Sequence, residues 1–171
     1  MQGSDEAAAI MEYLYRLPAT TAGKIVAHID LHETTDTDNT TFVPARAARD
    51  GAPVGYKNEF ENVPDGFYCV GNTLRPVLDF QQAIVEGVKS VTHIAPPDGA
   101  GLIIGEVEQI PGVILYAARE LGLCMGMTEA PFVTTTEVYP DSPGVSDEEC
   151  TAAQVMAVTS ALNYILTQQS H

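Results

Sequence analysis

The most informative stretch of this chain is Lys24-Ile-Val-Ala-His-Ile-Asp-Leu-His32, which has the pattern of a strand. Its β-branched and apolar residues predict a buried strand, and alternate residues of a strand share a face. His28, Asp30 and His32 are therefore expected to point the same way. His32 lies where the strand gives way to a polar run, and ligands of open α/β sheets bind outside the carboxyl ends of strands. Taken alone, a histidine at a strand end is more often a hydrogen-bonded structural residue than a metal ligand, so a second element is needed to favour a metal ligand at His32.

A second segment, Leu123-Cys-Met-Gly-Met-Thr-Glu129, predicts a short apolar strand that ends in a carboxylate just before Ala130-Pro131. Together, the Asp-Leu-His and Thr-Glu-Ala-Pro stretches resemble the C-terminal half of the zinc carboxypeptidase superfamily, from about Lys24 to about Leu166. The Asp-Leu-His-x-Thr-Thr variant is particularly similar to the aspartoacylase and succinylglutamate desuccinylase branch. The resemblance implies a zinc cofactor, with His32 as a metal ligand and Glu129 as the general base.

Glu137 competes with Glu129 for the role of base, because it also follows a threonine run that could end at the mouth of the site. Glu129 is preferred because its predicted strand follows a helix directly and leaves a loop of plausible length before the last helix. The other interpretations of Glu137 are an exposed loop acid, a partner of a nearby arginine, or a residue that supports the metal ligands from outside.

The zinc ligands that begin the site in the resembled superfamily have no match in this sequence. None of the four histidines, His28, His32, His93 and His171, has a glutamate three residues later, as the superfamily's His-x-x-Glu pair requires. Catalytic zinc needs three protein ligands. We therefore expect residues 1–171 to be a single domain, the C-terminal part of a longer catalytic domain. Such a chain is expected to associate with the missing N-terminal segment or with itself.

Helical and strand-like patterns alternate along the chain, which is typical of an α/β sheet. With the resemblance, this alternation predicts a three-layer α/β/α sandwich with a mixed sheet, which is zinc-carboxypeptidase-like (phosphorylase/hydrolase-like). One apolar stripe of the last helix, expected to pack on the sheet, is predicted from Ala152, Val155, Met156, Thr159, Leu162, Ile165 and Leu166. The expected elements are helices at 7–14 (capped by Ser4), 77–88 and 112–121, strands at 67–70, 91–95 and 102–107, and a last helix that begins at Ser146 with Glu149 in a capping box.

The polar stretch from His32 to Gly66 predicts a long loop, and long loops of compact domains are usually functional or mobile. It contains Arg46 and Arg49, which are either ordinary surface cations or a bidentate clamp for an acidic substrate. His93, on its short apolar stretch, is interpreted as a core histidine.

Composition excludes several classes of function. The 171 residues include eight Lys and Arg against 23 Asp and Glu, a net charge of -15, which disfavours nucleic acid and anionic membranes as partners. The chain has no apolar run of 18 residues and no apolar leader at its start. Three widely spaced cysteines fit a reducing compartment, so we expect a cytoplasmic protein.

The predicted function is that of a zinc-dependent metallocarboxypeptidase-like hydrolase, which cleaves a C-terminal peptide bond or a related amide with metal-activated water and a Glu base. Its substrate would be a peptide or an N-acyl amino acid. Two alternatives stay open: an N-acyl amino acid deacylase of the aspartoacylase type, and a catalytically inactive interaction domain.

Overall fold

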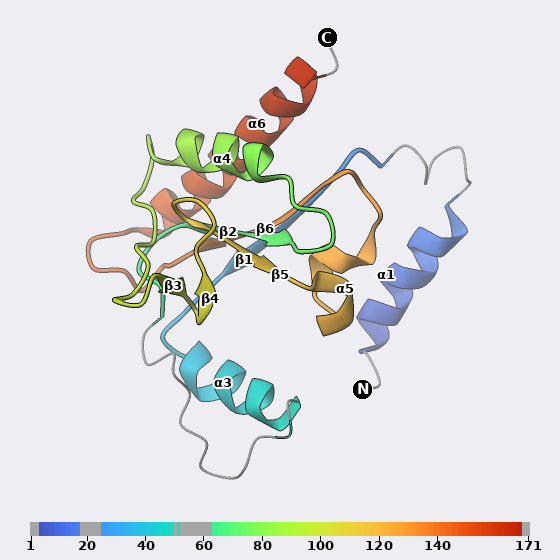
Figure 1. Ribbon diagram of the computed structural model, residues 1–171, viewed down its shortest axis with the longest axis horizontal. Coiled ribbons are helices and arrows are strands. Elements are labelled where there is room, and N and C mark those ends of the chain that lie inside the picture. The colour runs from blue at the N-terminus through green and yellow to red at the C-terminus, as the bar shows by residue number, and fades with distance from the viewer. Residues whose placement is uncertain (1–3, 18–24, 50, 52–62, 169–171) are drawn as a thin grey trace.

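The computed structural model describes residues 4–17, 25–49, 51 and 63–168. At its centre lies a four-stranded mixed sheet in the order β1-β6-β2-β5 (Figure 1). β1 runs parallel to β6, β6 antiparallel to β2, and β2 parallel to β5. The expected mixed α/β architecture is confirmed. The strands are β1 at Ala27–Glu33, β2 at Tyr68–Asn72, β5 at Val113–Tyr116 and β6 at Phe132–Val138.

Two helices that pack against each other, α4 (Leu78–Val88) and α6 (Asp147–Gln168), cover one face of this sheet (Figure 1). Large side chains of α4 meet small ones of α6, and a Cβ at Gly87 would lie only 2.0 Å from the hydroxyl oxygen of Ser160. Because alanines recur every four residues along α6, they form one stripe that admits α4 closely. The buried residues are Phe80, Gln81, Ile84, Val85 and Val88 of α4, and Cys150, Ala153, Ala157, Ala161 and Ile165 of α6.

The buried face of α6 differs from the predicted apolar stripe, of which only Ile165 is fully buried and Met156 is half-buried. Leu162 is 50% exposed, and Val155 and Leu166 are each 61% exposed. The prediction of one buried stripe is wrong because α6 carries apolar residues on several sides. Close packing against α4 selects the face with the smallest side chains, and hydropathy alone does not identify it.

The other face of the sheet carries smaller elements: the hairpin of β3 (Leu102–Ile103) and β4 (Glu106–Val107), the short helix α5 (Ala118–Leu121) and the 3₁₀ helix η1 (Cys124–Met127). These elements form a second, smaller core on β2 and β5. Its fully or nearly fully buried members are Tyr68, Val70, Ala95, Ile103, Ile114, Ala118 and Met125.

Two further helices lie at the margins of the body, α1 (Asp5–Arg16) and α3 (Asp38–Arg49) (Figure 1). The helix predicted near the start of the chain is confirmed, and its Ser4 cap accepts a hydrogen bond from the Ala7 N–H at 3.2 Å. α3 occupies part of the stretch predicted as loop, with Pro44 inside it.

The strands predicted between the two cores are partly wrong. Residues 91–95 form only an isolated bridge, between Ile94 and Phe67, and the hairpin lies wholly within 102–107. The helix predicted at 112–121 begins instead as β5, because Val113 to Tyr116 is a β-branched and aromatic run beside β2. Its helical part shrinks to α5, which ends at Gly122 with φ +69°, as the sequence predicted for the end of that helix.

The segment Leu123–Thr128 is also not a strand, and this correction alters the site. It forms η1, and a Cβ at Gly126 would lie 3.0 Å from the Ala118 carbonyl, so η1 packs tightly onto the first residue of α5. The strand that pairs with β1 is the following segment, β6.

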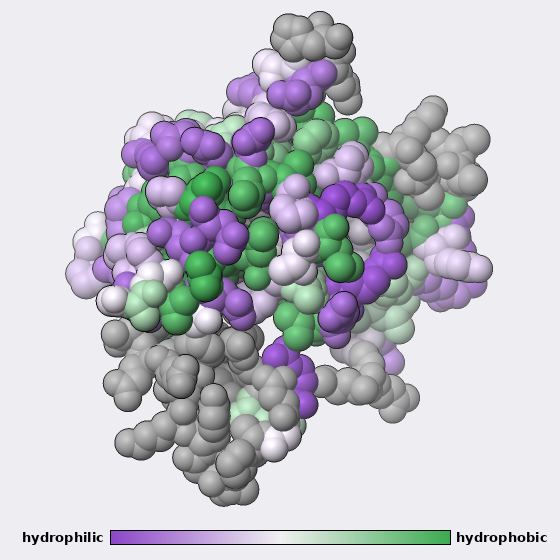
Figure 2. Space-filling view, in the orientation of Figure 1, coloured by the Kyte–Doolittle hydropathy of each residue, from purple (hydrophilic) through white to green (hydrophobic). Residues whose placement is uncertain are grey.

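The surface shown in Figure 2 alternates between hydrophobic and hydrophilic residues. In the part of the chain that the structure describes, no helix combines the length and the apolarity that crossing a bilayer requires.

Candidate metal centre

The carboxyl ends of β1 and β6 lie side by side, and their pairing defines the site. In the parallel register Asp30 is opposite Thr135 and His32 is opposite Glu137. Because alternate residues share a face, all four side chains lie on the face opposite α4 and α6. The prediction that Asp30 and His32 share a face agrees with their contact, a 3.1 Å distance between Asp30 Oδ2 and His32 Nδ1.

Asp30 and His32 shift each other's pKa in opposite directions. Burial raises the pKa of Asp30, but hydrogen bonds from His32 and Thr135 and the charge of His32 together outweigh it, so the net shift is downward. The hydrogen bond to Asp30 raises the pKa of His32; burial opposes this rise, and the charges of Asp30 and Glu137 add to it. A negatively charged Asp30 thus faces a histidine that readily carries a positive charge, and a cation can replace that proton.

Cys124 adds a third potential ligand from another part of the chain. Within the described ranges, one group of His, Cys, Asp and Glu side chains brings at least three ligand atoms together: those of Asp30, His32 and Cys124, all within 4.8 Å of one another. Burial, and then the charge of Asp30, raise the pKa of the Cys124 thiol. An oxygen, a nitrogen and a sulfur donor together suit Zn²⁺, so the residues fit the metal that the resemblance implied.

The position of Cys124 follows from the anchoring of η1. Met125 is fully buried in the smaller core, and the Leu123 N–H donates to the Ala118 carbonyl at 2.9 Å. At the other end of η1, Thr128 Oγ1 lies 3.1 Å from His28 Nδ1 on β1. His28, near the start of β1, therefore ties η1 to the sheet. Burial lowers the pKa of His28, and the negative charge of Asp30 only partly opposes this shift.

A short polar chain holds Glu137 beside His32. The Thr34 hydroxyl donates to Glu137 Oε2 at 3.1 Å, and it lies 3.2 Å from the hydroxyl of the buried Tyr68. The Thr34 N–H also donates to the Val138 carbonyl at 2.8 Å, which fixes the loop after β1 onto the end of β6. The carboxylate is thus half-buried and oriented, two properties expected of a general base.

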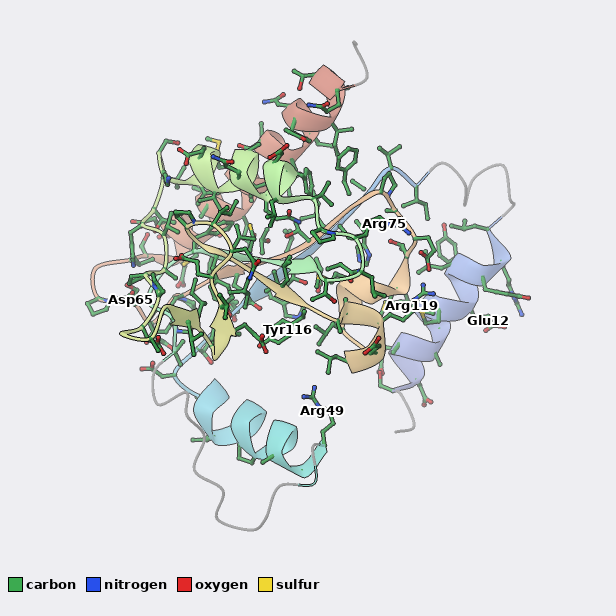
Figure 3. The ribbon with its side chains drawn as sticks, in the orientation of Figure 1. Glu12, Arg49, Asp65, Arg75, Tyr116 and Arg119 are labelled. Carbon is green, nitrogen blue, oxygen red and sulfur yellow. The ribbon has the colours of Figure 1, made fainter. Side chains whose placement is uncertain are left out.

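Glu129 lies elsewhere, at the entry to β6. Its carboxylate is 66% exposed and forms ion pairs with Arg75, at 3.2 Å, and with Arg119. Both arginines are on the α5 side of the body (Figure 3). Glu137 is five residues beyond Phe132, the first residue of β6, which corresponds to about 16 Å along the strand. Because β1 and β6 are parallel, Glu129 is therefore near the start of β1 and not near His32. The expectation that Glu129 ends a strand beside His32 is wrong, because the predicted strand is η1.

The two arginines proposed as a substrate clamp both belong to α3. The side chain of Arg46 lies outside the described residues. Arg49 is exposed in the last turn of α3 and projects toward the body of the molecule (Figure 3).

His93 is exposed, which corrects the prediction of a core histidine. Its Nε2 lies 3.0 Å from Asp65 Oδ1 and 3.5 Å from the hydroxyl of the buried Ser142, which itself donates to the same Asp65 oxygen. This trio differs from a catalytic Ser-His-Asp arrangement, in which serine and aspartate contact opposite nitrogens of the ring.

The sequence pointed to His32 and to Glu137 as the second choice, but nothing in it singled out Cys124 as a ligand. Its only local signal is a cysteine at the start of an apolar segment, far along the chain from β1. Comparison with protein-family models finds no matching family, and comparison with curated proteins finds no significant match.

Proposed function

We propose that this chain carries the catalytic edge of a zinc-dependent metallocarboxypeptidase-like hydrolase, which cleaves a C-terminal peptide bond or a related amide. The observation that supports it best is the register that places His32 opposite Glu137 on one face at the ends of two parallel strands. A metal ligand and a base must lie this close, because both act on one water molecule. The mixed sheet with helices on one face and shorter elements on the other is compatible with the three-layer sandwich that this function implies.

In this proposal Glu137 takes the role of base that the sequence assigned to Glu129. Glu137 is half-buried, oriented by Thr34 and next to His32. Glu129 is exposed, forms ion pairs with two arginines, and lies near the other end of β6, about 16 Å from Glu137.

The chemistry proceeds by addition of water to the amide carbonyl. Zinc, when bound, supplies Lewis acidity to the scissile carbonyl and to the attacking water. Glu137 accepts a proton from that water as the new C–O bond forms. The same carboxyl group returns the proton to the leaving nitrogen as the C–N bond breaks, which yields a carboxylic acid and an amine.

The same site chemistry serves a peptide and an N-acyl amino acid, which differ in what grips the free carboxylate of the substrate. The two α3 arginines stay candidates for that grip. An N-acyl amino acid deacylase is therefore the second candidate function, and parallel assays with C-terminal dipeptides and with N-acyl amino acids separate the two.

The test compares two conservative variants of the natural full-length protein, Glu137→Gln and Glu129→Gln. An amide at position 137 cannot accept the water's proton, so kcat should fall by about a hundredfold to ten-thousandfold while zinc content, measured by mass spectrometry, is retained. Glu129→Gln is the matched control and should stay within about twofold, since its ion pairs lie on the surface. Loss of turnover in the Glu129 variant alone would transfer the role of base back to it and refute this proposal.

A further inference from the structure

We propose that Asp30, His32 and Cys124 together form a three-ligand zinc site, with the Cys124 sulfur as a metal ligand. This inference rests on the proposed function for the role of His32 and adds the identity of its two companions. It replaces the expectation from the sequence that only one zinc ligand lies on this chain.

The separations of the donor atoms approach those of a tetrahedral zinc site. Typical bond lengths of about 2.0 Å to nitrogen and about 2.3 Å to sulfur place the two ligand atoms about 3.5 Å apart. Asp30 Oδ2 and His32 Nδ1 are already 3.1 Å apart, and the sulfur lies within 4.8 Å of both ligand atoms. Closure of the set requires a shift of about 1 Å by one thiol. Because Cys124 is exposed, its side chain has room for that shift.

The ligands belong to segments that the fold already holds in place. Asp30 and His32 are on β1, which pairs along its length with β6. Cys124 begins η1, which is held by the fully buried Met125 and by the contact of Thr128 with His28 on β1. The site thus bridges the sheet and the smaller core.

The mixture of donors selects the metal. One carboxylate, one imidazole and one thiolate form a set that Ca²⁺ and Mg²⁺ avoid, because these ions prefer oxygen ligands only. Three protein ligands also match the number typical of catalytic zinc, which keeps one position open for water. Glu137, opposite His32 in the register, is suitably close to such a water.

The sulfur ligand has a spectroscopic signature that is independent of activity. Co²⁺ replaces Zn²⁺ in such sites, and its bond to a thiolate produces an intense charge-transfer absorption in the near ultraviolet. We expect this band when the 171-residue chain is titrated with Co²⁺, and we expect Zn²⁺ to abolish it by displacement.

Three variants assign the band. Cys124→Ser should lose the band and weaken Co²⁺ binding. Loss of a residue that only supports a ligand costs roughly tenfold to hundredfold in metal affinity, and loss of the sulfur ligand itself should cost more. Cys150→Ala, a control at a buried cysteine in the core between the sheet and the two long helices, should keep the band. Asp30→Asn should keep the band but weaken binding, and unchanged affinity would remove Asp30 from the ligand set. Circular dichroism confirms that each variant is folded.

The inference would be overturned by Co²⁺ that binds through His32 without a thiolate band, or by a band that survives in Cys124→Ser. Absence of any Co²⁺ binding to the folded chain would also overturn it. None of these results decides the proposed function, which rests on the Glu137 and Glu129 variants of the full-length protein.

Discussion

The two faces of the central sheet differ in what they bury. The face under α4 and α6 is closed by large apolar side chains against an alanine stripe, with Ile84 and Ala157 both fully buried. The opposite face carries His28, Asp30 and His32 along β1, where η1 and the loop after β1 contact the sheet. The polar side chains there hold one another through hydrogen bonds.

Because of this difference, the residues that stabilise the fold and the residues that could bind a metal lie on different faces of the sheet. Buried apolar area on the helical face supplies most of the free energy of folding, while the polar face retains groups whose pKa values depend on their partners. A substitution on the first face should therefore change the free energy of unfolding without changing metal binding. Residues that contact both faces should affect both properties.

The largest effect is expected for Ile84→Ala on the helical face. Removal of this fully buried side chain should lower the free energy of unfolding by about 2–5 kcal/mol, because a cavity remains between α4 and α6. Leu162→Ala on α6 is the control and should change stability by less than about 0.5 kcal/mol, since this side chain is half exposed. Urea denaturation measures both. An equal loss in the two variants would mean that the wrong side of α6 has been assigned to the core.

A smaller effect is expected for Gln154→Ala, because the Gln154 side chain connects α6 to the ends of β1 and β6. The Gln154 amide on α6 donates to the His32 carbonyl at 2.8 Å and to the Thr136 carbonyl at 3.3 Å, and its oxygen accepts from the Thr136 hydroxyl at 2.6 Å. Its loss should cost about 1–3 kcal/mol and weaken Co²⁺ binding, because the end of β1 is released.

The control for this prediction is Gln82→Ala, an exposed glutamine of α4. It should leave urea denaturation and Co²⁺ binding unchanged. If both glutamine variants behaved alike, α6 would not position the end of β1.

The smallest effect concerns the pH dependence of stability without metal. The His32 pKa is raised above 6.5, so its contribution is complete below about pH 6.5 and fades as pH rises through the folded-state value. The lowered Asp30 pKa makes that contribution fade as pH falls below 3.8. His32→Gln should therefore lose more stability at about pH 5.5 than at about pH 8.5. Since His32 is 46% exposed, the difference should be roughly 1 kcal/mol or less.

His28→Gln supplies a control of opposite sign. The lowered His28 pKa means that protonation opposes folding, so this variant should lose less stability than the parent chain on acidification. Thermal melts in the presence of a chelator, at both pH values, measure each slope. Parallel slopes for the His32 variant and the parent chain would contradict the Asp30–His32 pairing.

Elements with strong local signals were predicted from the sequence. The Ser4 cap, the helix near residues 77–88 and the start of the last helix at Ser146 are confirmed, with the Glu149 N–H donating to the Ser146 hydroxyl at 3.2 Å. Capping and helical periodicity act within a few residues, so they are legible without the rest of the fold. The strand from Ala27 onward is also confirmed, because its β-branched and apolar residues are likewise a local signal.

The elements that were missed depend on distant partners. Residues 113–116 became β5 because β2 lies beside them, and residues 124–127 became η1 because β6 already occupies the place beside β1. An apolar run of four to six residues is compatible with either a strand or a helix, and only its neighbours select one.

The candidate site divides in the same way. The amino-acid sequence was sufficient to place Asp30 and His32 on one face at the end of a strand, because alternation along a strand is a local property. It favoured Glu129 over Glu137, and Glu129 lies away from His32, because the position of each carboxylate depends on which segment pairs with β1. It also could not bring in Cys124, which reaches Asp30 and His32 only through the packing of η1 on the sheet. Register and packing between remote segments are decided by the burial of the whole chain, and a short window of sequence does not contain them.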